Sequence, residues 1–286
     1  MTKTLKEIYS QQKTVISYEI FPPKNDENKE KEEKLFNELR VLKEFAPDLI
    51  SVTYGAGGSN ANQSIEIVKR IKNELNIEPM PHFTCVSSCF ENIRGYLNGL
   101  EALGVKNILA LRGDIPQGAY FSDFEHASDL VEYIKSDHNL SIAVAGYPEG
   151  HIDSPSQQDD LKWLKYKVDK GAEVIFTQLF FENEKFFRFV EKCRKSGINI
   201  PIIPGILPVT SFKQLEKMTS LCRVTIPPEF FEKLAKYSED KDYTRELGIE
   251  FATFQCKELV KNGVSGIHFY TLNKAYAVSK ILKEIQ

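Results

Sequence analysis

Eight short apolar runs, separated by longer stretches with helical periodicity, are the feature that most constrains how this 286-residue chain can fold. Regular alternation of strands and helices is typical of a parallel sheet whose connections are helices. The runs Ile108–Leu111 and Val174–Phe176 are almost wholly apolar, as expected of strands covered on both faces. Eight such units predict an α/β fold, the (β/α)8 TIM barrel, formed by residues 1–286 as a single domain. The predicted strands are Val15–Ile20, Leu49–Tyr54, Pro79–Val86, Ile108–Asp114, Ile142–Tyr147, Val174–Phe181, Pro201–Ile206 and Ser265–Tyr270.

Between these runs, apolar residues recur every three or four positions, which is the spacing of an amphipathic helix. In the first such stretch Leu35, Leu39 and Leu42 fall on one side, which is predicted to face the barrel. The segment before the last strand is longer than one crossover requires. It predicts an extra helix, Pro228–Lys236, and an acidic loop, Ser238–Asp242. The other predicted helices are Asn25–Phe45, Asn62–Leu75, Asn92–Leu103, Phe124–Ser136, Gln158–Lys170, Asn183–Ser196, Ser211–Thr219, Tyr243–Lys261 and Lys274–Ile285.

An open, doubly wound sheet would produce the same alternation of strands and helices. That fold is favoured by a Gly-x-Gly-x-x-Gly turn after the first strand, and this sequence has none. The closed barrel is therefore the preferred interpretation, and its active site is expected at the carboxyl ends of the strands.

Composition and charge narrow the classes of function. Hydrophobic residues make up 42% of the chain, enough for a large core, while a net charge of −3 and a pI of about 6.0 argue against a nucleic-acid or membrane partner. The stretch 1–12 is polar and has no apolar signal core. Five cysteines, an odd number, indicate free thiols and a cytoplasmic location. No metal is predicted, because Cys85 and Cys89 beside His82 supply too few ligands for zinc.

A carboxylate within an apolar run is costly unless it is paired or functional, and Glu19 is such a residue. Burial would raise its pKa and let it hold a proton near neutral pH, as a general acid must. The alternative is an edge residue whose side chain points toward solvent. Pro22 and Pro23 fix a sharp exit from this run, which favours a positioned site.

Arg112-Gly113-Asp114 closes the fourth run. Glycine lets a flat ligand approach the backbone, and arginine offers fixed donors to a phosphate or carbonyl. The alternative is a structural Arg112–Asp114 ion pair. The glycine-rich stretch Tyr54–Ser59 after the second run could bind a phosphate or lie under a ring.

Three catalytic patterns are missing from the sequence. No predicted strand ends in the lysine of a Schiff-base aldolase, the first strand has no His-x-His for a binuclear metal site, and there is no Gly-x-Ser-x-Gly. These absences disfavour a phosphate-binding barrel lyase and hydrolase chemistry.

Eight short stretches, taken together, resemble one family, the 5,10-methylenetetrahydrofolate reductases. They occur in the family's order and cover the chain from about Thr14 to its end. The stretches are Ser17–Pro23, Ser51–Ala56, Pro81–Cys85, Ala110–Asp114, Ala145–Glu149, Thr177–Phe181, Ile203–Pro208 and His268–Asn273.

The resemblance implies a flavoenzyme of one-carbon metabolism. In the family a nicotinamide nucleotide, NADH or NADPH, reduces FAD and leaves. The folate then binds at the same face of the flavin and accepts a hydride, so the kinetics are ping-pong. Glu19 matches the family's general acid. Asp114 matches an aspartate between flavin and folate that tunes the flavin potential.

The resemblance also implies residues that bind the cofactor and the two substrates. Lys167 and His151 suit the FAD phosphates, and Asp160 suits a ribose hydroxyl. The positions matching FAD contacts are Thr53, Tyr54, Ala56, His82, Arg112, Gly113, Asp114, Ala127, Tyr147, His151, Asp160 and Lys167. Those matching substrate contacts are Thr53, Asp114, Gln178, Gln214, Met218, Tyr270 and Lys274.

Some positions depart from the bacterial pattern of the family. Met218 replaces a phenylalanine that packs on the substrates, Lys274 replaces an arginine, and Trp163 and Tyr166 stand where polar cofactor neighbours are usual. The chain ends after the barrel, so the C-terminal regulatory domain of the eukaryotic enzymes is expected to be absent.

The resemblance also implies a homo-oligomer. Because of Met218, an alternative keeps the chemistry but takes electrons from a partner protein or ferredoxin. A flavin- or folate-binding protein without turnover is disfavoured because Glu19 is present.

Overall fold

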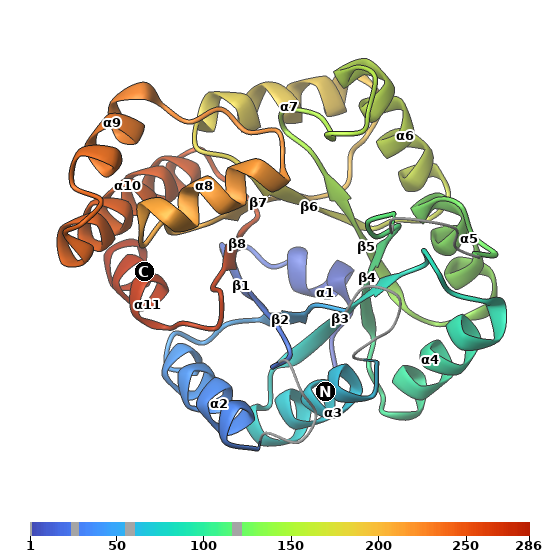
Figure 1. The fold of residues 1–286 in the computed structure, drawn as a ribbon. Coiled ribbons are helices and arrows are strands. Elements are labelled where there is room, and N and C mark those ends of the chain that lie inside the picture. Colours follow the sequence, from blue (N-terminus) through green and yellow to red (C-terminus); the bar gives the residue numbers. More distant parts are fainter. Residues whose placement is uncertain (1, 24–28, 55–60, 116–121) are drawn as a thin grey trace.

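The computed structural model describes residues 2–23, 29–54, 61–115 and 122–286. Eight parallel strands form a closed barrel in the order β1 to β8, with β8 paired to β1, so the predicted (β/α)8 barrel is confirmed. Helices surround the barrel on all sides (Figure 1). The strands are β1 Val15–Ile20, β2 Leu49–Val52, β3 Glu78–Thr84, β4 Asn107–Leu111, β5 Ser141–Gly146, β6 Val174–Leu179, β7 Ile202–Ile206 and β8 Gly266–Tyr270.

The helices follow the strands in the predicted order. The extra helix before the last strand is also confirmed: it is α9, Pro228–Lys236. The others are α1 Leu5–Tyr9, α2 Lys29–Lys43, α3 Ala61–Arg70 continued by the π-helix η2 Ile71–Leu75, α4 Phe90–Ala102, α5 Ala127–Asp137, α6 Gln157–Asp169, α7 Asn183–Lys195, α8 Phe212–Leu221, α10 Lys241–Lys261 and α11 Tyr276–Ile285.

Several predicted boundaries were wrong by a few residues, and the errors have local causes. α5 begins at Ala127 instead of Phe124, because His126 is extended and forms the N-cap of the helix. α10 begins within the predicted acidic loop, since the Asp240 side chain accepts a hydrogen bond of 2.9 Å from Tyr243 N. The predicted start of α2, at Asn25, lies outside the described residues.

The main core lies between the sheet and the helices. Alternate residues of β1 point in opposite directions, so Tyr18 and Ile20 pack toward α2, where Leu35, Leu39 and Leu42 are buried as predicted. Gly248 brings α10 against the carbonyl group of Val209, where a Cβ atom would overlap the backbone. This contact fixes the connection after β7, which borders the barrel mouth.

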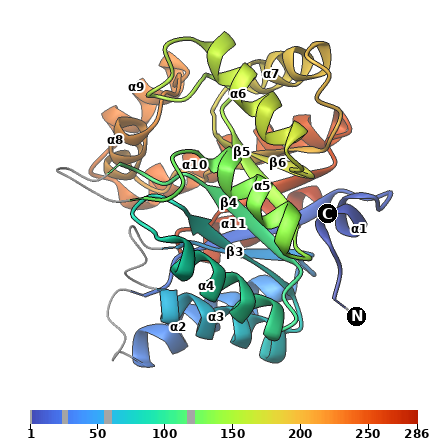
Figure 2. The same cartoon turned by 90° about the vertical axis from the view of Figure 1, so that its right-hand side faces the viewer.

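The end of the barrel opposite the strands' carboxyl ends is closed by α1, a helix that the sequence analysis did not predict. Leu5, Ile8 and Tyr9 are buried in one cluster with inward-facing residues of seven strands, β1 to β7, among them Leu49 and Val174. Figure 2 shows α1 on the right, far from α8 and α9. Any ligand of the barrel interior must therefore enter from the carboxyl ends. In the described part of the chain, no helix is long and apolar enough to cross a membrane.

Candidate active site

Glu19 lies in the wall of the barrel and points inward, beside Ser51 of β2 and Tyr270 of β8 in the strand register. Its residue surface is 9% exposed, so the alternative of an edge residue facing solvent is wrong. Burial raises the pKa of the Glu19 carboxyl to about 8. The group therefore holds its proton at neutral pH, and it can donate that proton to a bound molecule.

His82 lies beside Glu19, with 3.7 Å between His82 Nε2 and Glu19 Oε2. Burial lowers the pKa of His82 to about 3, so the imidazole is neutral when Glu19 is protonated. The distance is too long for a hydrogen bond. Neither group therefore stabilises the charge of the other, and the Glu19 carboxyl keeps its raised pKa.

Several buried polar atoms of the inner wall have no hydrogen-bond partner among the described residues. They include Nε2 of His82 and the hydroxyls of Ser51 and Thr84. A buried polar atom without a partner costs free energy, and native proteins usually satisfy such atoms with protein, water or ligand groups. Since these atoms line the interior near Glu19, they indicate a polar ligand.

Tyr270 forms a fixed part of the wall across from these residues. Its hydroxyl donates a 2.7 Å hydrogen bond to the carbonyl oxygen of Thr177. Gly205 leaves room for the ring, since a Cβ atom there would lie 2.7 Å from Tyr270 Cε2. Burial raises the pKa of Tyr270 well above its usual range, with Glu19 adding to the effect, so the phenol is a neutral donor.

The stretch Arg112–Asp114 follows β4 and forms the floor of a cavity at the mouth. Gly113 has φ +88°, and a Cβ atom there would lie 2.7 Å from Val86 and 2.8 Å from Thr84. Glycine is therefore required for both conformation and space. Arg112 forms its ion pair with Asp153, at 2.8 Å, so the Arg112–Asp114 pair considered from the sequence is wrong. Asp114 remains exposed at the mouth.

A second cavity continues from this floor toward α5 and α6. Lys167 is buried there; burial lowers its pKa to about 8, with Asp160 opposing the effect, and its Nζ donates a 2.7 Å hydrogen bond to the Ala145 carbonyl. Burial raises the pKa of Asp160, while Lys167 lowers it. Both cavities are lined by Arg112, Tyr147 and His151, so the two cavities form one continuous trough.

Most of the predicted cofactor-contacting residues line this trough. Its residues include Tyr54, Arg112, Gly113, Asp114, Ala127, Tyr147, His151, Asp160 and Lys167. Thr53 is half-buried just after β2, His82 lies deeper beside Glu19, and Ala56 lies outside the described residues. His126 was not among the predicted residues; its ring stacks on Trp163 at 5.4 Å between centroids with 9° between planes. Because the stack joins two helices, no local pattern indicated it.

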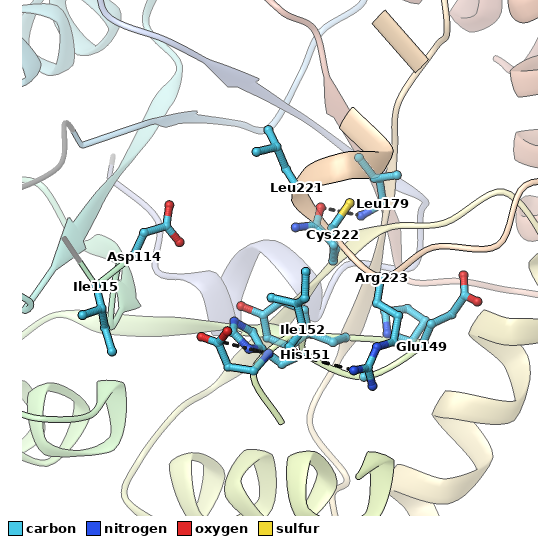
Figure 3. Close-up of a pocket in the computed structure, with 14 residues that line it drawn as sticks. Asp114, Ile115, Glu149, His151, Ile152, Leu179, Leu221, Cys222 and Arg223 are labelled. Atoms are coloured by element: carbon cyan, nitrogen blue, oxygen red, sulfur yellow. Dashed lines mark hydrogen bonds and ion pairs between the residues drawn. The ribbon is translucent and has the colours of Figure 1, made fainter. Parts of the chain in front are cut away.

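A further cavity, of about 430 Å³, opens over the ends of β4, β5 and β6. Figure 3 shows Asp114 on one side of it and Glu149 and Arg223 on the other. Gln178, which the resemblance assigns to the substrates, lines this cavity, and its Oε1 accepts a 2.9 Å hydrogen bond from Leu179 N. Glu149 and Arg223 were missed, since neither ends an apolar run.

The other predicted substrate residues lie elsewhere around the mouth. Gln214, Tyr270 and Lys274 line a cavity after β7 and β8. Met218 on α8 is half-buried and packs against a separate apolar cluster that includes Leu179 and Leu215. Among the residues described, no group of three His, Cys, Asp or Glu side chains could hold a metal ion.

The comparison with known proteins agrees with the motifs. Residues 4–286 match the family model described as methylenetetrahydrofolate reductase. The chain belongs to this family. It is 38% identical over 270 residues to the 5,10-methylenetetrahydrofolate reductase of Escherichia coli, covering 93% of this chain and 90% of that protein.

Two further matches differ from this chain in length or in sequence. The methylenetetrahydrofolate reductase (NADH) 1 of Arabidopsis thaliana is 38% identical over 285 residues. The match covers 94% of this chain but 48% of that protein, so the chain spans about half the length of this relative. A solved structure from Clostridium thermocellum, a protein that binds two copies of 5-methyl-5,6,7,8-tetrahydrofolic acid, matches with a TM-score of 0.72. It covers 98% of this chain and 96% of that one at 16% identity, which supports the barrel fold alone.

Proposed function

We propose that this protein reduces 5,10-methylenetetrahydrofolate to 5-methyltetrahydrofolate, using FAD and electrons from NADH or NADPH. Residues 1–286 act as one catalytic unit. The observation that carries the proposal is the buried Glu19 carboxyl in the barrel wall, whose pKa burial raises to about 8, in a chain that belongs to the reductase family. A carboxyl group can serve as the acid at neutral pH when its pKa is raised in this way.

The residues of the trough fit FAD. Gly113 lets the backbone pack closely against Val86 and Thr84 at the base of the trough, and the Thr84 hydroxyl has no partner among the described residues. Farther along, Lys167 and His151 would hold the diphosphate, and Asp160 would accept from a ribose hydroxyl. A buried lysine whose pKa burial lowers gains from an anion next to it. The chemistry that bound FAD supplies is two-electron hydride transfer between a nicotinamide and the folate carbon.

Glu19 prepares the folate for reduction. Its proton goes to the bridging nitrogen, the five-membered ring opens, and the methylene carbon becomes an electrophilic iminium. The carboxylate that remains is then close to the cation that it has created, and the attraction stabilises this state. The low pKa of His82 keeps a second proton donor out of the site.

Asp114 and Gln178 would position the substrates at the mouth. Both line the cavity of Figure 3, and Asp114 also lines the trough. A carboxylate at the junction of the trough and this cavity can accept hydrogen bonds from ring N–H groups of the pterin. Its charge also disfavours negative charge that develops beside it. Because both substrates meet the same junction, they are expected to bind in turn, which is a ping-pong scheme.

Purified protein tests the proposal directly. It should retain a yellow chromophore with a flavin spectrum. Under anaerobic conditions the chromophore should be bleached by NADH or NADPH, and methylenetetrahydrofolate should restore it while 5-methyltetrahydrofolate forms. Protein that binds no FAD when it is added would refute the proposal. Reduced ferredoxin belongs in the donor panel, since bleaching by ferredoxin alone would support a protein electron donor.

We also propose that the protein is a cytoplasmic homo-oligomer. Five free cysteines, three of them buried, suit a reducing compartment. Sedimentation velocity of the purified chain tests the oligomeric state, and a monomer at micromolar concentration would contradict it.

A further inference from the structure

Arg223 lies on the rim of the cavity in Figure 3, across from Asp114. Its side chain is exposed, and its Nη2 donates a 3.3 Å hydrogen bond to the carbonyl oxygen of Ile152. This contact joins the segment after α8 to the loop after β5. Most of the guanidinium's five donors remain available to a ligand in the cavity.

The segment that carries Arg223 is held in place by a buried carboxylate. Glu149 is 8% exposed and accepts hydrogen bonds from the backbone N of Thr225, at 2.8 Å, and from the Thr225 hydroxyl. Lys185 Nζ lies 3.7 Å from Glu149 Oε2 and balances its charge. Glu149 is thus engaged by other groups and fixes the backbone two residues from Arg223. The arginine is therefore placed by the fold.

Arg223 differs from two other cations of the mouth, Arg112 and Lys274, in having no acidic partner among the described residues. Arg112 pairs with Asp153 at 2.8 Å, and Lys274 pairs with Glu38 at 3.2 Å. Within the described ranges, no carboxylate lies within the 4.0 Å ion-pair distance of Arg223. A fixed, unpaired guanidinium at the rim of a cavity suits a phosphate, which it can bind through two donors at once.

We propose that Arg223 binds the diphosphate of the nicotinamide dinucleotide. The inference rests on the proposed function and identifies where one of its substrates is held. The nicotinamide must reach the junction near Asp114, so the diphosphate extends away along the cavity toward the β5 and β6 loops. Gln214 and Lys274, which match folate-side positions of the family, line a separate cavity, and the carboxylates of the folate would extend toward it. The two anionic ends would then leave the mouth in different directions.

The test compares Arg223→Gln, Arg223→Lys and Arg188→Gln in the FAD-loaded protein. Arg188 is an exposed arginine on α7, paired with Glu184, and its variant is the matched control. Loss of one charged donor pair should raise the KM for NADH in anaerobic flavin reduction about tenfold in Arg223→Gln. The Lys variant should recover part of this loss, and the KM for methylenetetrahydrofolate should not change. Lys274→Gln should show the reverse pattern.

A binding measurement gives a second readout that does not depend on turnover. ADP-ribose carries the diphosphate without the nicotinamide. Its Kd, measured by calorimetry, should rise about tenfold in Arg223→Gln. NADH and NADPH should lose affinity equally. A greater loss for NADPH would assign Arg223 to the 2′-phosphate and overturn the diphosphate assignment.

The outcomes separate this inference from the function on which it rests. If the wild-type protein is bleached by NADH and Arg223→Gln keeps its KM and its Kd for ADP-ribose, the Arg223 assignment alone is wrong. If ferredoxin reduces the flavin and nicotinamide nucleotides do not, the assignment is also wrong, while the folate chemistry stands. If the protein binds no flavin, the proposed function fails and this inference fails with it.

Discussion

Replacement of Glu19 by Gln should remove a pH-dependent cost to folding. The substitution keeps the size and the hydrogen-bonding atoms of the side chain but removes the titrating proton. In the folded protein the pKa of Glu19 is raised from 4.5 to about 8 by burial among β1, β2 and β8. The folded state therefore binds this proton more tightly than the unfolded chain does.

The sign and size of the effect follow from linkage. Because the folded-state pKa is the higher one, the contribution to stability is fully present below pH 4.5 and is lost as the pH rises through about 8. Each pH unit is worth about 1.36 kcal/mol, so the full loss is on the order of 5 kcal/mol. About 4 kcal/mol of it should fall between pH 5 and pH 9.

The assay is urea unfolding of the flavin-free wild type and Glu19→Gln at several pH values from 5 to 9. As the pH rises, the free energy of unfolding of Glu19→Gln should increase relative to that of the wild type. Glu250→Gln is the matched control, since Glu250 is exposed on α10 and its variant should follow the wild type. Parallel stability curves for wild type and Glu19→Gln would show that Glu19 is ionised in the fold, and the acid role would be refuted.

The same variant has a kinetic signature. Glu19→Gln should keep flavin reduction by NADH but lose folate reduction by about 10²–10⁴-fold, the usual contribution of a general acid. In the wild type, folate reduction should fall above pH 8, because the acid is then deprotonated. Survival of both half-reactions in the variant would contradict the assignment.

Three further perturbations test other parts of the molecule. Asp114→Asn removes a negative charge beside the proposed flavin site and should raise the flavin's reduction potential, measured by dye equilibration, and weaken folate turnover; an unchanged potential would count against the tuning role. Gly113→Ala should cost about 1–2 kcal/mol of stability, because the residue has φ +88°, and should weaken FAD binding through contacts with Val86 and Thr84; unchanged FAD affinity by fluorescence titration would argue that the ring lies elsewhere. Ile8→Ala opens the buried end of the barrel and should cost about 2–5 kcal/mol in denaturant unfolding with no change in FAD affinity; a cost near zero would mean that α1 is not packed against the barrel in solution.

Features with a local cause were predictable from the sequence. The alternation of apolar runs and helical periodicity predicted the eight-stranded barrel. A strand buried on both faces leaves a continuous apolar run, whereas a helix buried on one face leaves apolar residues every three or four positions. The position of Glu19 in such a run predicted a buried acid, and the structure places it in the wall with a raised pKa. The ordered motifs predicted the family, which the comparison confirmed.

Features that depend on distant segments were not predictable from the sequence. α1 has only five residues, and its apolar side is buried only because the barrel leaves an open end there. The partner of Arg112 is Asp153, which lies on a different loop from Asp114. Arg223 acquires its place through Glu149, which is 74 residues earlier in the chain. Periodicity and motifs report which residues are buried and where strands end, whereas closure of the barrel decides which loops meet, and only that closure brings the charges of the mouth together.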